Sequence, residues 1–250
     1  MSIPKVSLFG IPFSKMNMKQ TVDYLTAVIE RKEPHQVITA NPIMVMAALE
    51  DPNYSEMMRR AELIVPDGAG VVWAAEYVGN PVAERVAGYD LLHELMKAGE
   101  QKQWKVYLLG ASSEVIQASA AKLKLMYRRL KLSEPMTAFF GEDQDAEVIA
   151  EIKAAAPDLL FVGRSASTQE PWIDKYKKKQ LSVPVMMGVG GSFDVLSGRT
   201  KRAPVLFQKK LKLEWFYRLL KEPWRYKRML ALPKFAVKVM REKKTVQNPR

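Results

Sequence analysis

Short apolar runs alternate with longer segments of helical periodicity over the first 190 residues of the chain. The runs are rich in valine, isoleucine, leucine and phenylalanine, and most stop at a glycine, a proline or an asparagine. Short apolar runs bounded by turn residues are typical of strands buried on both faces. The predicted strands cover residues 5–9, 35–40, 63–65, 105–109, 136–140, 158–162 and 183–188.

The segments between these runs predict helices. Val22, Leu25 and Ile29 follow helical spacing behind Asn17, a favourable N-cap residue. Strands that alternate with such helices build βαβ units, so we expect an α/β fold with a mostly parallel sheet. Ligands of such folds bind outside the carboxyl ends of the strands. The predicted helices cover residues 18–32, 42–50, 53–60, 70–78, 90–102, 114–129, 145–155 and 170–179.

Composition narrows the class of protein. The 250 residues are 48% hydrophobic and 26% charged, which is ordinary for one large globular domain, or for one domain with an appendage. The chain has no cysteine, which excludes disulfides, iron–sulfur clusters and cysteine nucleophiles. Its two histidines, His35 and His93, lie far apart in sequence, which argues against a histidine-rich metal site and a Ser-His-Asp triad.

The sequence predicts neither a targeting segment nor a membrane-spanning helix. The first residues do not combine a positive region with an apolar run, so no signal peptide is predicted. No stretch approaches the ~18–20 apolar residues that a spanning helix needs. We therefore expect a cytoplasmic protein that does not cross a membrane.

The net charge of +12 is distributed unevenly. Residues 199–250 hold 17 of the 39 basic residues and only 3 of the 27 acidic ones, whereas residues 1–198 are close to neutral. We therefore divide the chain into a body, residues 1–198, and a basic appendage, residues 199–250. Such asymmetry is typical of a catalytic body with an arm for an anionic surface.

The appendage combines cations with aromatic rings. Pro223 and Pro233 divide it into short helices. Basic residues recur at spacings of three and four, so they share a helix face if Pro223 only kinks the path. These residues are Arg218, Lys221, Arg225 and Arg228. Rings beside cations suit a bilayer interface. One alternative is a solvated helix docked on the body through Leu213, Phe216 and Leu220; another is binding to nucleic acid.

Candidate chemistry lies where predicted strands end. Asp67 follows the third strand and precedes Gly68 and Gly70, which would let a ligand approach the backbone. A carboxylate there acts as a general base or as the N-cap of the next helix, and the residues alone fit both roles equally. Thr39 and Asn41 follow the second strand and offer uncharged hydrogen-bonding groups, although Asn41 before a proline is also a helix-start signal.

Other loops offer cations and glycines. Arg85 could pair with a diphosphate or form a structural salt bridge. Gly110 could admit a nucleotide at the start of the following helix. The loop after residue 188 is rich in glycine, but no βαβ unit continues from it, which counts against a dinucleotide fingerprint. Asp143 and Asp145 are spaced like a metal-binding pair but open a helix, so we predict no dedicated metal site.

Taken together, these blocks resemble the WecG/TagA/CpsF glycosyltransferases. The resemblance covers nearly the whole chain, and a segment at residues 213–228 looks like the appendage of the TagA branch. The ordered blocks that carry it are Thr39-Ala40-Asn41-Pro42, Pro66-Asp67-Gly68-Ala69-Gly70, Glu84-Arg85-Val86-Ala87-Gly88-Tyr89-Asp90, Gln169-Glu170-Pro171-Trp172, Gly188-Val189-Gly190-Gly191-Ser192-Phe193-Asp194 and Lys201-Arg202-Ala203-Pro204.

The resemblance implies a Rossmann-like sheet with helices on both faces and a short helical appendage. It also implies an inverting, metal-independent enzyme without a cofactor, which moves N-acetylmannosamine (ManNAc) from UDP-ManNAc to GlcNAc-diphospho-undecaprenol. That step belongs to wall teichoic acid synthesis, and the WecG branch uses the uronic acid of the donor instead. The implied partners are the two substrates and the inner face of the cytoplasmic membrane, without nucleic acid; a homo-oligomer is left open.

Site roles follow from the same resemblance. Asp67 matches the catalytic base, and Arg85 and Gln169 match polar groups near the reaction centre. The appendage residues Arg218, Lys221, Arg225 and Arg228 match groups that reach the lipid diphosphate or the membrane. The expected substrate-binding residues are Thr39, Asn41, Gly68, Gly110, Glu170, Gly190, Gly191, Asp194 and Arg202.

One segment departs from the family pattern. The family usually carries a Gly-x-Pro-Lys-Gln-Glu run, whereas here Ser167 and Thr168 replace the Pro-Lys pair and Arg164 is new. The loop at Gly110 also has fewer glycines than usual. We expect both departures to affect affinity for the donor more than the fold.

Overall fold

The computed structural model describes residues 3–136, 142–204, 214–221, 223, 226–243 and 245–247. Its centre is a six-stranded sheet in the order β4-β3-β8-β7-β5-β6, in which every paired strand is parallel. The central strands β7 and β8 read as unbroken apolar runs because both faces of the sheet are covered, whereas β3 also carries His35, Gln36 and Thr39. The strands are β3 (His35–Ala40), β4 (Leu63–Pro66), β5 (Lys105–Gly110), β6 (Lys131–Leu132), β7 (Leu159–Gly163) and β8 (Val185–Gly188).

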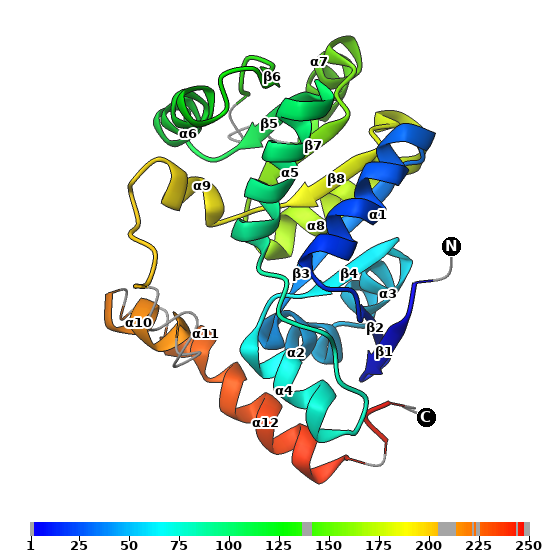
Figure 1. Ribbon diagram of the computed structural model, residues 1–250. Helices are drawn as coiled ribbons and strands as arrows, with labels where there is room; N and C mark the ends of the chain where they lie inside the picture. Colours follow the sequence, from blue (N-terminus) through cyan, green and yellow to red (C-terminus); the bar gives the residue numbers. More distant parts are fainter. Residues whose placement is uncertain are drawn as a thin grey trace.

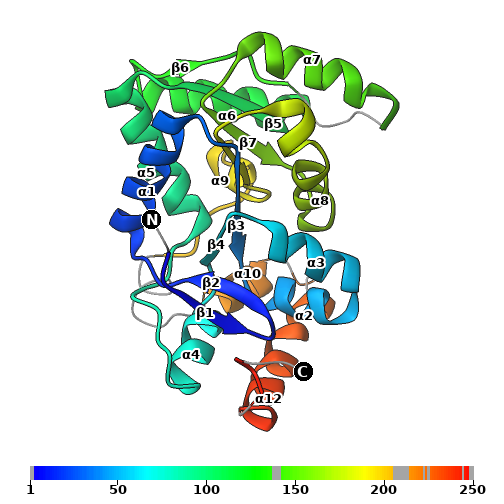
Figure 2. The same cartoon turned by 90° about the vertical axis from the view of Figure 1, so that its right-hand side faces the viewer.

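Helices cover the two faces of this sheet, as Figures 1 and 2 show. On one face the apolar sides of α1 (Met18–Arg31), α5 (Gly88–Lys102), α6 (Ser113–Met126) and α9 (Ser192–Leu196) form one continuous core. On the other face α7 (Asp145–Ala155) and α8 (Ala166–Tyr176) form a second core, and a short π-helix, η2 (Lys177–Leu181), extends α8. The expected α/β architecture with a parallel sheet is confirmed.

A third core lies at the end of the sheet next to β4. It contains a two-stranded antiparallel hairpin, β1 (Lys5–Leu8) and β2 (Ile11–Ser14), which packs beside α2 (Pro42–Glu50), α3 (Pro52–Arg60) and α4 (Ala69–Tyr77). The sequence predicted β1 but not β2. Pro12 lies within β2, and a proline inside a short run argues against a strand unless the strand is at an edge.

The last helices lie along the lower side of the molecule in Figure 1. They are α10 (Glu214–Lys221), α11 (Tyr226–Met229) and α12 (Ala231–Arg241). Phe235 and Val239 of α12 are fully buried in the third core, where the Phe235 ring meets that of Phe9. In contrast, Phe216 and Leu220 of α10 are exposed, so the suggested docking through these residues is not what the structure shows. Leu213 lies outside the described residues.

Two predicted boundaries need correction. The helix predicted from residue 170 begins earlier, at Ala166, with Ser165 as its N-cap and Pro171 inside it. Proline suits the first turn of a helix better than its interior, so the prediction began the helix at residue 170, with Pro171 in its first turn. At the strand predicted over residues 136–140, Met136 makes a parallel bridge to Leu109, residues 137–141 lie outside the described residues, and a short 3-10 helix (Glu142–Gln144) precedes α7. None of the helices that the structure describes combines the length and apolar composition needed to span a bilayer.

Candidate active site

Asp67 lies where β4 ends. Its backbone N–H donates to the Ala40 carbonyl at 2.9 Å, which ties the carboxyl ends of β3 and β4 together. The next residue, Gly68, is the N-cap of α4 but provides no side-chain cap. A Cβ at Gly68 would lie 2.7 Å from Pro42 Cδ, so this glycine lets the loop cross closely over α2. The Asp67 carboxylate therefore stands at the ligand-binding edge of the sheet, and it does not act as a helix cap in the described contacts.

Arg85 faces this carboxylate from the loop before α5. Its Nη2 lies 3.2 Å from Asp67 Oδ1, and both side chains are about a quarter exposed, at 28% and 23%. The loop is fixed because the Val86 N–H donates to the Pro66 carbonyl at 2.9 Å. The predicted cation is thus held beside the predicted base, where it remains reachable by a ligand.

Thr39 approaches the same point from β3. A Cβ built on Gly88 would lie 2.9 Å from Thr39 Oγ1 and 3.3 Å from Asp67 Oδ2. Gly88 is the first residue of α5, and no side chain caps that helix. The N-terminus of α5 is therefore pressed directly against Thr39 and Asp67, and its partial positive charge favours an anionic ligand.

A polar cavity of about 130 Å³ opens in front of these groups. It is smaller than the roughly 300–1,000 Å³ that a whole drug-sized ligand occupies, so it suits part of a ligand, such as a diphosphate or a sugar ring. Its lining joins the ends of β3, β4 and β8 to the start of α5. The lining residues are Thr39, Asp67, Arg85, Ala87, Gly88, Tyr89, Val189, Gly191, Ser192, Val195 and Arg202.

Arg202 enters this cavity from the segment that follows α9. Its guanidinium binds both oxygens of Asp90, at 2.7 and 2.8 Å, and lies 4.7 Å from the centre of the Tyr89 ring. Burial alone would raise the pKa of Asp90, but the hydrogen bonds and charge of Arg202 hold that pKa below its ordinary value. A carboxylate that stays ionised keeps the planar guanidinium fixed, as a bidentate pair does.

An apolar cavity of about 690 Å³ lies on the other side of Asp67, between the body and the last helices. Its floor is made by α2 and α4, and its opposite wall by α10, α11 and α12. Its lining residues are Asn41, Pro42, Ile43, Asp67, Gly68, Ala69, Gly70, Trp73, Arg85, Leu219, Tyr226, Arg228, Met229, Leu230, Leu232, Pro233, Phe235 and Ala236. A cavity of this size and character suits an apolar ligand.

Asp67 and Arg85 line both cavities. A carboxylate at that junction can take a proton from a hydroxyl presented by a ligand in one cavity while a second ligand occupies the other. The cations Arg85 and Arg202 and the start of α5 lie on the polar side, where they can stabilise a negatively charged leaving group. The arrangement therefore fits group transfer between an anionic polar molecule and a molecule with an apolar part.

The remaining predicted residues divide between the cavities and the packing behind them. Asn41 lines the apolar cavity, but its Oδ1 also caps α2 by accepting from the N–H groups of Ile43 and Met44. Gly191 lines the polar cavity. Gln169 and Glu170 are buried behind the glycine loop and line neither cavity.

Gly110 and Asp194 also lie away from both cavities. Gly110 has φ of +124°, and a Cβ there would lie 2.5 Å from the Gly163 carbonyl oxygen, so this glycine permits close packing of the β5 and β7 ends. Asp194 of α9 lies 3.7 Å from Arg199. The substrate-binding roles of Gly110, Asp194 and Glu170 stay predictions.

The predicted appendage residues are described unequally. Arg228 of α11 is exposed and lines the apolar cavity. Arg218 and Lys221 belong to α10, but their side chains lie outside the described residues, and so does all of Arg225. The common face proposed for these four cations therefore stays a prediction.

The two histidines and Asp145, one of the acidic pair, have structural partners. His35 contacts Tyr24 Oη at 2.9 Å, and His93 contacts Tyr127 Oη at 2.7 Å, where burial lowers the pKa of His93. Asp145 accepts from Trp172 Nε1 at 2.8 Å and from Tyr176 Oη at 2.6 Å. Within the residues that the structure describes, no group of three or more histidine or acidic side chains is placed to hold a metal ion.

Sequence reasoning missed several residues of the site. Gly88 and Tyr89 belong to one of the family blocks given above. Their position at the start of a helix was the signal that could have assigned them to the site. The apolar cavity wall on α12 was missed because the prediction for the appendage relied on its basic residues and not on the spacing of its apolar ones. Leu232 and Ala236 recur at a spacing of four, which was a signal for a helix face.

Comparison with known proteins agrees with this geometry. A family model described as "Glycosyl transferase WecG/TagA/CpsF family" matches residues 6–249. The chain belongs to this family.

Three of the similar curated proteins share the name N-acetylglucosaminyldiphosphoundecaprenol N-acetyl-beta-D-mannosaminyltransferase. The protein of that name from Bacillus subtilis (strain 168) is 37% identical, over 95% of this chain and 92% of its own. Those from Bacillus spizizenii and Staphylococcus aureus (strain MW2) are each 34% identical, over 90% and 97% of this chain and 86% and 95% of their own. The predicted family is therefore confirmed, and with it a glycosyltransferase.

Proposed function

We propose that this glycosyltransferase moves ManNAc, with inversion, from UDP-ManNAc to the 4-hydroxyl of GlcNAc-diphospho-undecaprenol. The product would be an early lipid intermediate of wall teichoic acid. The names of the relatives support the two substrates, at 34–37% identity over nearly the full length of each chain. The observation that carries the proposal is that Asp67 and Arg85 line both a polar and an apolar cavity.

In the proposed reaction Asp67 is the general base. Its carboxylate takes the proton from the GlcNAc 4-hydroxyl, whose oxygen forms a bond to the anomeric carbon of ManNAc. The bond from that carbon to the UDP oxygen breaks at the same time, and UDP leaves from the opposite side. A single displacement of this kind inverts the anomeric centre and needs no covalent intermediate on the enzyme.

The leaving diphosphate would be stabilised by the protein itself. Arg85 and Arg202 bring two guanidinium groups to the polar cavity, and the uncapped start of α5 adds backbone N–H groups. Fixed donors aimed at developing charge are effective because they need no reorganisation during the reaction. This set of cations supports a mechanism that does not depend on a metal ion.

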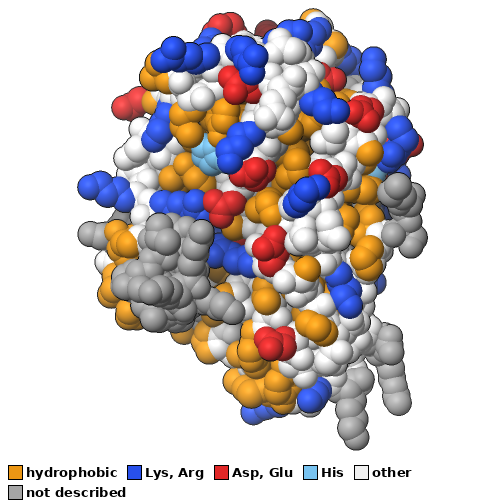
Figure 3. All heavy atoms as spheres, in the orientation of Figure 1, with side chains coloured by type: hydrophobic (Ala, Val, Ile, Leu, Met, Phe, Trp, Pro, Cys, Tyr) orange, Lys and Arg blue, Asp and Glu red, His pale blue; other side chains and the backbone are white. Residues whose placement is uncertain are grey.

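The lipid part of the acceptor would use the apolar cavity and the surface beside it. Val237 and Met240 of α12 are exposed apolar side chains, and Lys227, Lys234 and Arg241 are exposed cations nearby in sequence. Figure 3 shows hydrophobic side chains gathered at the lower end of the molecule, where Figure 1 places α12. A helix with these two features suits the headgroup region of an anionic bilayer. We propose peripheral binding at the cytoplasmic face of the membrane.

The test of the reaction is UDP release from UDP-ManNAc with and without a GlcNAc-diphospho-lipid analogue. We expect release that depends on the acceptor, and a disaccharide lipid with an inverted anomeric centre. Release only with the uronic acid donor would assign the chain to the other donor class. The absence of release with either donor would refute the proposed reaction.

The test of membrane binding is sedimentation with vesicles of phosphatidylglycerol and phosphatidylcholine. The double variant Val237→Asp/Met240→Asp should lose most of its binding, because it places charge on the apolar strip of α12. The matched control is Leu125→Asp/Met126→Asp, at exposed apolar residues of α6, which is far from α12 in sequence. Equal sedimentation of the two variants would refute the assigned membrane face.

A further inference from the structure

Gln169 connects the glycine loop after β8 to the interior. The Gly190 backbone N–H donates to Gln169 Oε1 at 3.1 Å, and Gln169 Nε2 donates to Glu170 Oε1 at 3.1 Å. Gln169 is 6% exposed and Glu170 is 1% exposed. The side-chain oxygen of Gln169 thus accepts a hydrogen bond from the loop, and its NH₂ group donates one to a buried carboxylate.

The glycine loop is shaped to receive these two side chains. A Cβ on Gly188 would lie 2.1 Å from Glu170 Oε1 and 2.4 Å from Gln169 Nε2, so only a glycine leaves room for them. Gly190 has φ of +33°, an unusual conformation for other residues, which the bond to Gln169 holds in place. The next residue, Gly191, lines the polar cavity beside Asp67 and Arg85.

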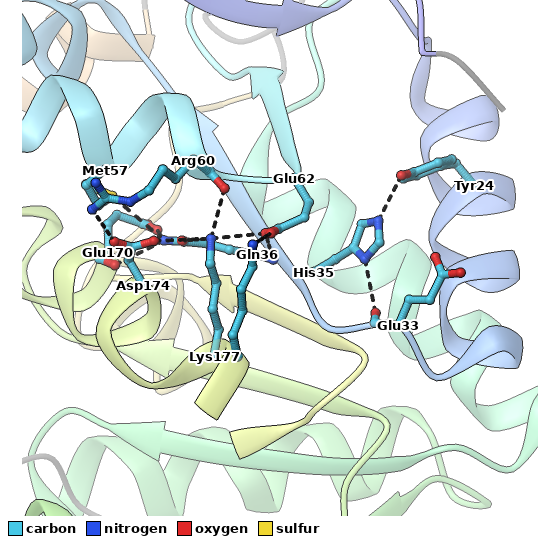
Figure 4. Close-up of polar contacts among 11 residues, drawn as sticks. Tyr24, Glu33, His35, Gln36, Met57, Arg60, Glu62, Glu170, Asp174 and Lys177 are labelled. Atoms are coloured by element: carbon cyan, nitrogen blue, oxygen red, sulfur yellow. Dashed lines mark hydrogen bonds and ion pairs between the residues drawn. The ribbon is translucent and has the colours of Figure 1, made fainter. Parts of the chain in front are cut away.

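The carboxylate behind the loop is itself held from further inside. Gln36 Nε2 donates to Glu170 Oε2 at 3.1 Å and to the Glu170 carbonyl at 3.0 Å. Gln36 Oε1 accepts from Lys177 Nζ at 3.1 Å, and Lys177 also contacts Glu62 and Asp174 at 3.1 and 3.2 Å. Figure 4 shows this chain of polar groups running from η2 past β3 toward α8.

Each group in this chain has its hydrogen-bonding direction set by its neighbour. Lys177 only donates, so Gln36 must present its oxygen to it and its NH₂ to Glu170. Glu170 then accepts from both amides, which leaves the Gln169 oxygen to accept from the loop. A buried network whose members are all satisfied fixes one arrangement, since the alternatives leave a buried polar group unpaired.

We infer that Gln169 and Glu170 are positioning residues, which hold the loop of residues 188–191 in the shape that binds the nucleoside diphosphate and do not touch the substrates. The inference rests on the proposed function and changes one part of it, since the sequence assigned Gln169 to the reaction centre and Glu170 to substrate binding.

The test begins with UDP binding by calorimetry and with steady-state kinetics of the full-length chain. Gln169→Leu should weaken UDP binding about tenfold and raise the KM for the donor to a similar extent. The kcat at saturating donor and the KM for the acceptor should stay within about threefold of the wild type. The control is Gln117→Leu, the same change at an exposed position of α6, which should alter none of these values.

A pair of charge-swapping variants separates positioning from contact with substrate. At pH 8, above the pKa of about 7 to which burial raises Glu170, Gln169→Glu should impair UDP binding, because the new carboxylate cannot donate to Glu170 and lies beside it as a like charge. The double variant Gln169→Glu/Glu170→Gln should restore binding to within about threefold. In the double variant the amide at position 170 donates to the carboxylate at position 169, which still accepts from the Gly190 N–H.

Each outcome decides the inference. A kcat reduced about a hundredfold by Gln169→Leu, with UDP binding unchanged, would show that Gln169 acts on the reacting atoms. Failure of the double variant to recover, with melting temperatures like the wild type, would likewise overturn the positioning role, as would unchanged binding in Gln169→Leu. A wild type that binds UDP but transfers no ManNAc refutes only the proposed reaction; one that binds no UDP refutes the inference as well.

Discussion

The two cavities that meet at Asp67 are built in different ways. The polar cavity lies at strand ends, and its cations are fixed by partners, as Arg202 is by Asp90 and Tyr89. The apolar cavity is closed by helices from the far end of the chain, with Leu230, Leu232 and Ala236 along one wall. We therefore expect one side to recognise its proposed ligand through fixed charges and the other through apolar surface.

This difference explains how one carboxylate, Asp67, can lie beside two chemically different substrates. We propose that the donor is recognised through charged hydrogen bonds, which are strong and directional. We propose that the acceptor is recognised through apolar contacts, which allow its lipid chain to shift along the cavity. Changes on the polar side should therefore affect the donor alone, and changes on the apolar side the acceptor alone. Changes at the junction should have the largest effect on the chemical step, and loss of a polar-side cation a smaller one, since these cations are proposed to stabilise the leaving diphosphate.

The largest expected effect is at the junction. Asp67→Asn should lower kcat by about 100-fold or more, because a general base contributes roughly 10²–10⁴-fold. Donor and acceptor KM values should change little, since the amide has nearly the same shape. Initial rates of UDP release, with circular dichroism as the check on folding, measure this. Turnover close to the wild type would remove Asp67 from the role of base.

The next effect is confined to the polar side. Arg202→Gln should raise the donor KM by about ten- to a hundredfold, because a hydrogen bond to a charged group contributes about 1.5–3 kcal/mol. The acceptor KM should be unchanged. Arg202→Lys keeps the charge but loses the bidentate geometry, so it should fall between the wild type and Arg202→Gln. An equal rise in both KM values would contradict the separation of the cavities.

A smaller effect is expected on the apolar side. Ala236→Glu places a carboxylate on the wall of the apolar cavity, and an unpaired charge there is costly. The KM for a long-chain acceptor should rise about tenfold, equivalent to about 1.4 kcal/mol. The KM for a short-chain acceptor and for the donor should stay the same. If the short-chain acceptor were affected equally, the cavity would not be the lipid site.

The smallest effect on catalysis, but a measurable one on stability, concerns the network behind the polar cavity. Burial raises the pKa of Glu170 to about 7, although the bonds from Gln36 and Gln169 and the charge of Lys177 lower it. Burial raises the pKa of Tyr54 in α3 as well, and the negative charge of Glu170 raises it further. The folded chain thus retains a proton on Glu170 that the unfolded chain loses near its ordinary value of 4.5.

The sign of the effect follows from that retained proton. The contribution of Glu170 to stability is present below pH 4.5 and is lost as the pH rises through about 7. Relative to Glu170→Gln, the wild type should therefore lose about 3 kcal/mol of unfolding free energy between pH 4 and pH 8, since one pKa unit is 1.36 kcal/mol. Urea unfolding of both proteins across that range measures the difference. A constant difference would show that Glu170 does not titrate in this window.

Much of the fold could be predicted because its signals are local. The central strands β7 and β8 are unbroken apolar runs, and β3 and β5 are mostly apolar, so the sequence predicted the strands but not the order in which they pair. The hairpin strand at β2 was missed because Pro12 masks it. The early start of α8 was missed because Pro171 suggested a boundary.

The site was predictable to the extent that strand ends converge. Thr39, Asp67, Arg85, Gly191 and Arg202 all line the polar cavity, as their places after strands or in family blocks suggested. The network behind it was not predictable, since its partners are distant: Gln36 bonds to Glu170 and Lys177, which lie 134 and 141 residues away. The available signal was Gln36, a polar residue within a mostly apolar strand. Such a residue indicates a buried hydrogen bond but not the residue that makes it.

Because α12 is buried against the hairpin of β1 and β2, the third core can finish folding only after α12 has been synthesised. The Phe9 N–H donates to the Val246 carbonyl at 2.7 Å, and the Phe9 ring rests on Phe235, so two segments more than 220 residues apart share one core. During synthesis the hairpin can pack beside α2, α3 and α4 early, but the part of it that meets α12 stays uncovered until α12 has been made. The apolar cavity, and with it the proposed lipid site, is therefore enclosed only after α12 has been made.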